Sequence, residues 1–460
     1  MLMNKKILIF PIEIKVRELL PKMYLAYQIL RRVKNIKIVI GGSRFITQKF
    51  SYNDCIWFDK NTHYKQREKH PIHLNNFMLM LDEEGPISFH HKKLIKERYS
   101  PQIISQIDHF LFAGVYDFSK LSIKKKIKNF TISGNPKFDL LKDKSIFKNE
   151  VNSIKKKYKN IIFIPGHTNH FDESVRIKKE SDYILSNNNN KAYVNKHAAQ
   201  KQNAFNIIKK NYFSLLESVK VIAEKNPNLT VIFRKHPSES SDFINKYFKE
   251  RPKNLKIVYK YSITPWIISC KYYLHSGCQS VLEAAYLKKK ILTYMPLSTP
   301  NLKNYKFFSP NFVNQKNLLK FLLKNIDNKK KYNYKNLTKI CKNLDTKNYF
   351  YKIFLDQINI FCKNTNSSFE PIYQNKNLKY LWLKFMRSIL SKLKNYVNKF
   401  EFVKILLPFQ YLLTKEQKLN KFDKLSFFEI KNILKKFNYG RKLNNISIKK
   451  LSENTFLLSN

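Results

Sequence analysis

The chain has 460 residues, and 43% of them are hydrophobic. A single core of the usual size does not bury this many hydrophobic residues, so the sequence predicts two α/β domains with an appendage. Lys and Arg outnumber Asp and Glu by 87 to 33. The formal charge of +54 favours anionic partners, namely nucleic acid, anionic lipid headgroups, or substrates with phosphate or carboxylate groups. A general drift of composition toward Lys, Asn and Ile explains the charge equally well. The five cysteines form no C-x-x-C pair, and their odd number argues against a disulfide framework and for a reducing compartment.

The first part of the chain has the pattern of a doubly wound β/α domain. Residues 6–11 form an apolar run too short for a signal peptide, with Glu13 close behind it, and predict a first strand. Helical spacing of apolar residues over 23–33 and a β-branched run at 36–40 complete a βαβ unit. Three more buried parallel strands are predicted at 76–81, 109–113 and 130–133. We place this N-terminal Rossmann-like domain at residues 1–145.

A second α/β domain is predicted after a lysine-dense segment, residues 141–160, that has few apolar anchors. An Asn-rich stretch at 186–191 is expected to form a loop, and residues 204–224 a long helix. The expected strands are 161–165, 230–233, 257–259, 272–275 and 291–294, with a further helix from residue 279. We place this second Rossmann-like domain at residues 155–325.

Residues 326–460 differ from the rest because their pattern predicts basic, aromatic-rich helices without evident strands. Lys and Arg on one face with Trp, Phe and Leu on the other would suit an interfacial helix on an anionic membrane, whereas a helical extension packed on the two domains fits the same pattern. No run reaches the roughly 18 apolar residues of a membrane span. The nearest, 402–413, contains Lys404 and Pro408. We expect a cytoplasmic protein, either free or peripheral on the inner face of the membrane.

Ligands of open parallel sheets bind beyond the carboxyl ends of the strands, so the residues that follow each predicted strand are candidates for a site. Directly after the strand FMLML come Asp82, Glu83, Glu84 and Gly85. Three adjacent carboxylates repel one another, which raises the pKa of at least one of them and suits a general base for a hydroxyl nucleophile. A solvated acidic turn would have the same sequence.

A second candidate follows the strand TVIF, where Arg234, Lys235, His236 and Pro237 stand at the predicted start of a helix. Two cations, free backbone N–H groups and the helix dipole would favour a phosphate there. Pro237 suits the first turn of a helix. The alternative is a basic helix entrance with a structural histidine.

The third candidate lies at another strand-to-helix junction and consists of Ser276, Gly277, Ser280 and Glu283. Small and hydroxyl-bearing residues let backbone amides approach a phosphate, and Glu283 could accept hydrogen bonds from ribose hydroxyls. Ser280 and Glu283 also have the S-x-x-E spacing of a capping box, which would begin the same helix with or without a ligand.

The sequence lacks the motifs of several other enzyme classes. It has no G-x-x-x-x-G-K-[ST], G-x-G-x-x-G, G-x-S-x-G, H-E-x-x-H or D-x-D, so phosphate-loop ATPases, dinucleotide enzymes, serine hydrolases and zincins have little support. The histidines at 90, 91, 167 and 170 have no further ligands at metal spacing. We therefore expect neither a metal site nor a cofactor.

Together the three candidates resemble the motifs of GT-B glycosyltransferases that use cytidine monophosphate (CMP) sugars. These are the bacterial sialyltransferases, the Kdo transferases and the related surface carbohydrate biosynthesis family. These families share three motifs, which occur here in the same order and in the same halves of the chain. The acidic pair followed by Gly matches Glu83-Glu84-Gly85, the His-Pro motif matches His236-Pro237, and the Ser-rich motif matches Ser276 with Ser280. Further likeness lies in FPIEIKVREL, which contains Glu13, Arg17 and Glu18, in SGNPKFDLL, and in HSGCQSVLEAAYLKKKILTYMP. The resemblance covers residues 6–296, and its one departure is the three residues that separate the two serines.

The resemblance implies a GT-B fold, with two Rossmann-like domains facing a cleft that binds the donor. It implies an enzyme that moves an acidic sugar, Kdo or a sialic acid, from a CMP-sugar to a surface polysaccharide or a lipooligosaccharide, without a metal ion. Glu84 would be the preferred catalytic carboxylate, with Glu83 and Asp82 beside it, and His236 would help the phosphate leave. The other implied ligands are Arg234, Lys235, Pro237, Ser276, Gly277, Ser280 and Glu283 for the nucleotide, and Glu13, Arg17 and Glu18 for the substrate.

Two other functions remain open at this stage. Transfer of a polyol phosphate from a cytidine diphosphate donor, as in teichoic-acid polymerases, would use a similar fold and a His-Pro-like site. A basic nucleic-acid-binding protein would fit the charge and the 27 Tyr and 36 Phe residues, but the sequence has no helix-turn-helix, zinc or RNP signature. We therefore expect no nucleic-acid partner.

Overall fold

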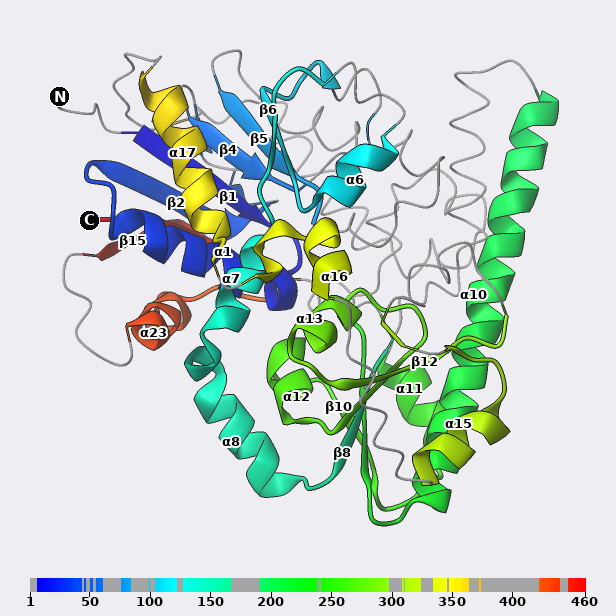
Figure 1. Ribbon diagram of the computed structural model, residues 1–460. Coiled ribbons are helices and arrows are strands. Elements are labelled where there is room, and N and C mark those ends of the chain that lie inside the picture. Colours follow the sequence, from blue (N-terminus) through cyan, green and yellow to red (C-terminus); the bar gives the residue numbers. More distant parts are fainter. Residues whose placement is uncertain are drawn as a thin grey trace, which may run out of the picture.

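The computed structural model shows an α/β protein with two large sheets (Figure 1). It describes residues 6–43, 45–46, 50–52, 55–60, 76–83, 99, 104–121, 127–166, 191–237, 239, 241–297, 308–309, 311–323, 334–345, 347–363, 372–373, 422–438 and 446–460. Short elements outside the two sheets are β3 (Phe50–Ser51), which pairs with β14 (Ile372–Tyr373), and the 3₁₀ helices η2 (Lys144–Phe147) and η3 (Lys342–Leu344).

The N-terminal sheet has eight strands in the order β15-β16-β2-β1-β4-β5-β6-β7. Its parallel strands are β1 (Lys6–Ile12), β2 (Ile36–Gly42), β4 (Ile56–Asp59), β5 (Phe77–Leu81), β6 (His109–Phe112) and β7 (Phe130–Ile132). The chain passes from β1 to β2 on one side and then crosses to β4 on the other. The switch point of this sheet, where ligands of such folds bind, therefore lies between β1 and β4.

The C-terminal sheet has six parallel strands in the order β10-β9-β8-β11-β12-β13. They are β8 (Ile161–Pro165), β9 (Thr230–Arg234), β10 (Leu255–Val258), β11 (Tyr272–His275), β12 (Lys290–Tyr294) and β13 (Asn311–Phe312). The helices of this half are α10 (Lys191–Lys225), α11 (Ser241–Tyr247), α12 (Ile263–Ser269), α13 (Val281–Tyr286) and α15 (Gln315–Leu323). The switch point lies between β8 and β11, so both halves confirm the predicted doubly wound architecture.

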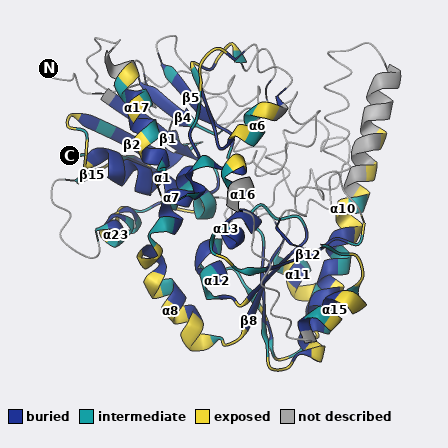
Figure 2. Cartoon of the chain, viewed as in Figure 1, coloured by how far each residue is buried: buried dark blue, intermediate teal, exposed yellow. Residues whose placement is uncertain are grey.

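Burial explains why the strands were predictable. The central strands β1, β8, β9 and β11 are buried along nearly their whole length (Figure 2), as expected for parallel strands that are covered on both faces. The first helix, α1 (Lys15–Leu30), begins well before the predicted range 23–33. The prediction began too late because Glu18, Pro21 and Lys22 interrupt the apolar spacing in the first turns of the helix. The predicted loop at 186–191 lies outside the described residues except for Lys191, which begins α10.

The lysine-dense segment between the domains is helical. It contains α7 (Pro136–Lys142) and α8 (Lys148–Lys157), and Val151 and Ile154 are the buried residues of α8. Two anchors on a ten-residue helix are too few for a clear helical pattern, which is why this helix was not predicted. The remaining helix of the first half is α6 (Val115–Lys120).

The C-terminal region is more than a helical extension, because part of it completes the N-terminal domain. Its described elements are α16 (Tyr334–Ile340), α17 (Phe350–Lys363), α23 (Phe427–Phe437), β15 (Ser447–Ser452) and β16 (Thr455–Ser459). The strand β16 pairs antiparallel with β2, and both α17 and α23 contact α1 (Figure 1). The expectation that residues beyond 325 contain no strands is therefore wrong. In the described parts of the chain, no helix is long and apolar enough to cross a bilayer.

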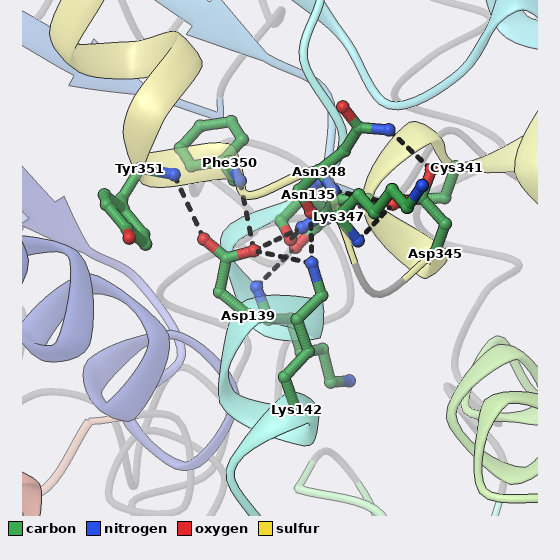
Figure 3. Close-up of polar contacts among 11 residues, drawn as sticks. Asn135, Asp139, Lys142, Cys341, Asp345, Lys347, Asn348, Phe350 and Tyr351 are labelled. Carbon is green, nitrogen blue, oxygen red and sulfur yellow. Dashed lines mark hydrogen bonds and ion pairs between the residues drawn. The ribbon is translucent and has the colours of Figure 1, made fainter.

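A buried polar junction fastens the returning chain to the first domain (Figure 3). The carboxylate of Asp139, on α7, accepts hydrogen bonds from the backbone amides of Phe350 and Tyr351, both at 3.0 Å, at the start of α17. Asn343 donates to Asp139 at 2.7 Å and to the carbonyl of Asn135 at 2.8 Å. These bonds satisfy amides that a helix start leaves unpaired, so they fix α17 on α7.

We expect a chain truncated after residue 445 to lose much of the stability of the N-terminal domain. Truncation removes Phe456 and Leu458, which are buried in the same core as β1 and α1, and exposes the edge of β2. Two such side chains account for about 3–6 kcal/mol of burial free energy, which differential scanning calorimetry would detect. Replacement of Lys449 and Lys450 with alanine is the control, because both side chains are exposed on β15. An unchanged melting temperature after truncation would contradict this role of the hairpin.

Candidate functional site

The carboxyl ends of β1 and β4, at the switch point of the N-terminal sheet, hold a cluster of opposite charges. Glu18, which is 2% exposed, accepts hydrogen bonds from the backbone amide of Glu13 at 2.8 Å and from the next amide at 3.1 Å. Lys60, the residue after β4, forms ion pairs with Glu18 and, at 3.1 Å, with Glu13. The Nζ of Lys22 lies 3.9 Å from Glu18 and donates to a β1 carbonyl at 2.6 Å.

Glu83, which follows β5, joins this cluster. Burial raises the pKa of Glu83 above its ordinary value and the charge of Glu18 adds to the rise, whereas Lys22, Lys60 and Arg17 act to lower it. A raised pKa was predicted for the acidic run, and Glu83 has one. Among the described residues, the causes that raise this pKa are burial and the charge of Glu18, which lies on α1 and outside the run.

The structure thus brings together Glu13, Arg17, Glu18 and Glu83, which the sequence placed in two separate motifs. Asp82 is buried beside them at the end of β5, and Glu84 lies outside the described residues. Sequence analysis missed the two lysines of the cluster. The spacing of Glu18 and Lys22, four residues apart within an apolar helix, is a signal that could have revealed Lys22. Lys60 follows a strand of four residues that was not predicted.

In the C-terminal domain, the last residue of β9 is a buried cation. Arg234 is 5% exposed, its Nη2 donates to a backbone carbonyl at 2.8 Å, and its Nε has no hydrogen-bond partner in the described structure. Burial lowers the pKa of Arg234, and the charges of Tyr259, Cys278, Glu283 and Glu239 oppose this effect. No described carboxylate forms an ion pair with Arg234. A buried cation without a paired anion is costly, so this position suits an anionic ligand.

The His-Pro segment forms a turn and not the start of a helix, so that expectation is wrong: α11 begins only at Ser241. The turn is fixed by Glu239, which is 1% exposed and was not predicted. Its carboxylate accepts hydrogen bonds from the amide of His236 and the hydroxyl of Tyr212, and its own amide donates to the carbonyl of His236 at 2.9 Å. Pro237 is buried in the same turn.

Close packing holds this turn against the end of β8. A Cβ on Gly166 would clash with the carboxylate of Glu239 and lie 2.8 Å from the amide of His236, so a side chain there would displace the turn. Lys235 is tied to the domain, because its Nζ donates to Ser241 Oγ at 2.5 Å and lies 5.1 Å from the ring centroid of Tyr259. Arg234 and His236 are therefore held by a rigid frame.

The third candidate segment follows β11. His275 is fully buried, and its Nδ1 accepts hydrogen bonds from the amides of Gly277 at 3.2 Å and Cys278 at 3.4 Å. The proton must then be on Nε2, which lies 3.1 Å from Thr293 Oγ1 and donates to it. Within this turn the Oγ of Ser276 is buried and has no partner among the described residues. An unsatisfied buried hydroxyl at a strand end is a second feature that suits a ligand with acceptor oxygens.

Ser280 does not cap α13, so the capping-box hypothesis is wrong. Its hydroxyl lies 2.6 Å from the hydroxyl of Tyr273 and 3.0 Å from Cys278 Sγ, and it makes no bond to the helix amides. Glu283, the other residue of that motif, is 1% exposed. Its Oε2 accepts from Thr264 Oγ1 at 2.6 Å.

The other oxygen of Glu283 forms an ion pair with Lys137, which belongs to α7 of the N-terminal domain. This contact joins the carboxyl-end sides of both sheets, since Lys137 follows β7 and Glu283 follows β11. The predicted role of Glu283 in binding ribose stays a prediction. Among the described residues, no group of three or more His, Cys, Asp or Glu side chains could hold a metal ion.

Comparison with solved structures identifies the fold. No family model matches the sequence, and no curated protein matches it. The structure of S. aureus MnaA with UDP resembles this chain with a TM-score of 0.50 and 11% identity, over 80% of this chain and 100% of that one. A putative UDP-N-acetylglucosamine 2-epimerase from Listeria monocytogenes gives a TM-score of 0.48 and 10% identity, over 80% and 100% of the two chains. The wall teichoic acid polymerase TagF gives a TM-score of 0.46 and 12% identity, over 79% of this chain and 90% of that one. The protein therefore has the GT-B fold, as predicted.

Proposed function

We propose that this protein is a GT-B glycosyltransferase of surface-glycan synthesis that uses a nucleotide-activated donor. In its finer form the proposal is the one implied by the sequence motifs: a CMP-sugar donates Kdo or a sialic acid to a polysaccharide or glycolipid acceptor. The observation that carries the proposal is Arg234, a buried guanidinium with no paired carboxylate in the described structure. It stands at the end of β9, near the switch point of the C-terminal sheet, where a donor phosphate would bind.

The unsatisfied hydroxyl of Ser276 supports the same ligand chemistry. A phosphate oxygen accepts hydrogen bonds, so it would satisfy both the Nε of Arg234 and the Oγ of Ser276, two buried donors of this domain that lack partners in the described structure. His236 lies in the turn that follows Arg234, where it could contact the same phosphate. These residues would stabilise the negative charge that develops on the phosphate as the sugar–oxygen bond breaks.

The charge cluster in the N-terminal domain would serve the acceptor. Glu83, whose pKa is raised by burial, would accept the proton of the attacking hydroxyl, a role for which a raised pKa is favourable. We favour Glu83 as the base because it lies among the charges of the cluster and burial raises its pKa. Arg17 would hold a carboxylate of the donor or the acceptor.

A donor with a diphosphate is the alternative, as in transfer of a polyol phosphate from a cytidine diphosphate (CDP) polyol. The specific observation in its favour is that cations approach the site from both domains, Arg234 from one and Lys137 from the other. Both reactions release CMP, so the identity of the donor decides between them.

We expect cytidine nucleotides to raise the melting temperature of the purified protein more than uridine, guanosine or adenosine nucleotides do. A ligand at 100 times its dissociation constant adds about 2.7 kcal/mol, which corresponds to a shift of roughly 5–10 °C. Replacement of Arg234 with methionine should abolish the shift, because the phosphate loses its buried cation.

The matched control is Arg251→Met, which removes an exposed arginine of the same domain and should leave the shift unchanged. A shift that survives in Arg234→Met would place the nucleotide elsewhere. If no cytidine nucleotide stabilises the wild-type protein but a uridine nucleotide does, the CMP-sugar proposal fails, and a uridine diphosphate (UDP) sugar takes its place. If no nucleotide of any kind does, the transferase proposal fails as a whole.

A further inference from the structure

Lys137 is held in a defined position by the segment Ser133-Gly134-Asn135-Pro136-Lys137, which sequence analysis noted without assigning a role. Asn135 Oδ1 accepts a hydrogen bond from the amide of Lys137 at 3.0 Å and so begins α7. The amide of Asn135 in turn donates to Asn343 Oδ1 at 2.9 Å. Gly134 has a φ of +86°, and a Cβ at this position would clash with the side chain of Asn343. The start of α7, and with it the base of Lys137, is therefore rigid.

The ammonium group of Lys137 reaches into the other domain and still has donors to offer. An ammonium has three N–H donors, and Glu283 is its only side-chain partner in the described structure. The side chain is 31% exposed, whereas Glu283 is 1% exposed. Lys137 can therefore donate a hydrogen bond to a ligand that enters from solvent while it keeps its ion pair with Glu283. The buried carboxylate of Glu283 would not lose its partner.

The place that Lys137 reaches is next to the candidate phosphate site. Glu283 is one of the groups whose charge acts on Arg234, and Cys278 of the Ser276 turn is another. Arg234 ends β9 and Glu283 follows β11, and these two strands flank β8. Since Lys137 pairs with Glu283, cations from both domains lie at the carboxyl ends of these strands. Two cations on two sides of a site match a ligand with two separate anionic groups.

We propose that Lys137 is the second anion-binding residue of the donor site, supplied by the N-terminal domain, and that it binds the anionic group of the donor that Arg234 does not bind. This inference rests on the proposed function. The second group is the outer phosphate of a nucleoside diphosphate donor or the sugar carboxylate of a nucleoside monophosphate donor. In both cases the donor carries a second anionic group close to the phosphate that is attached to the nucleoside. Lys137 therefore favours such donors over a nucleoside monophosphate without a second anionic group.

The test compares dissociation constants of CMP, CDP and CMP-sialic acid, measured by isothermal titration calorimetry, for the wild-type protein, Lys137→Met and Lys137→Arg. One of the doubly anionic ligands is expected to bind the wild type about 10- to 100-fold more tightly than CMP, the size of a charge-assisted hydrogen bond. In Lys137→Met this preference should fall to about 1 while CMP affinity stays unchanged, and Lys137→Arg should restore most of it. A preference for CDP identifies the phosphate as the second group, and a preference for CMP-sialic acid identifies the carboxylate.

The controls separate this inference from a purely structural role of the lysine. Lys148→Met removes an exposed lysine from α8 and should change no affinity. If Lys137→Met does not fold, Lys137→Gln takes its place, because its side-chain amide can still donate a hydrogen bond to Glu283 but carries no charge. An equal loss of affinity for all three ligands would show that Lys137 only fastens the domains together, and a preserved preference would also overturn the inference. If the wild type binds none of the ligands, the cytidine-donor proposal itself fails.

Discussion

Replacement of Glu18 with glutamine is expected to lower the free energy of unfolding by about 3–5 kcal/mol, the usual cost of removing one partner of a buried ion pair. Glu18 is 2% exposed and Lys22 is 1% exposed, so the buried ammonium of Lys22 would lose the carboxylate that lies 3.9 Å from it. A glutamine also has only one acceptor oxygen for the two backbone amides and Lys60. Chemical denaturation with urea would measure the loss.

The pH dependence of this loss follows from the pKa of Glu18. Burial by itself would raise that pKa, but Lys60 and Lys22 outweigh it and hold the pKa below its ordinary value. A carboxyl group with a depressed pKa stabilises the fold above its unfolded pKa of about 4.3, and the contribution disappears as the pH falls through the folded pKa. The difference between wild type and Glu18→Gln should thus be full at pH 7 and should shrink below about pH 4.

A surface carboxylate with a similar partner provides the control. Glu429 lies 2.8 Å from Lys15, but its side chain is 34% exposed, so Glu429→Gln should cost less than about 1 kcal/mol. Adding Lys22→Met to Glu18→Gln should recover part of the stability, because it removes the unpaired charge. Equal losses in Glu18→Gln and Glu429→Gln would refute the view that the buried cluster stabilises the domain.

The strands of both sheets were predictable because buried parallel strands are continuous apolar runs. The predicted segments 161–165 and 272–275 coincide with β8 and β11. The hairpin β15–β16 was missed because β15 is an edge strand with exposed Lys449 and Lys450, so it lacks an apolar run. The strand β4 (IWFD) was missed as well, and with it Lys60, which follows it.

The candidate site was predictable in part for the same reason. Side chains that follow a strand can be found from the sequence, which is how Glu83, Arg234 and Ser276 were selected. Their partners come from distant segments, as Lys137 does for Glu283, and only the packing of the two domains brings them together. Local hydrogen bonding also changed two expectations, since Glu239 fixes the His-Pro turn where a helix was expected, and Ser280 bonds to Tyr273 where a cap was expected.

Replacement of Glu83 with glutamine is expected to lower kcat by about 10²- to 10⁴-fold, the usual contribution of a general base. The protein should still fold, because glutamine has the same size as glutamate and adds no charge at this site. The measurement is release of CMP from a CMP-activated acidic sugar or from CDP-glycerol in the presence of acceptor. Glu453→Gln, in the exposed turn between β15 and β16, is the control and should keep full activity.

The pH profile tests whether the proton is accepted by Glu83 itself. A general base acts in its ionised form, so activity should rise with pH through a pKa that burial and Glu18 have raised above that of an ordinary glutamate. Arg17 acts to lower this pKa, and Arg17→Gln should therefore move the acid limb of kcat to higher pH. Glu83→Gln should remove the limb altogether. If Glu84→Gln removes it and Glu83→Gln does not, the base is Glu84, and the charge cluster around Glu83 serves only the fold of the N-terminal domain.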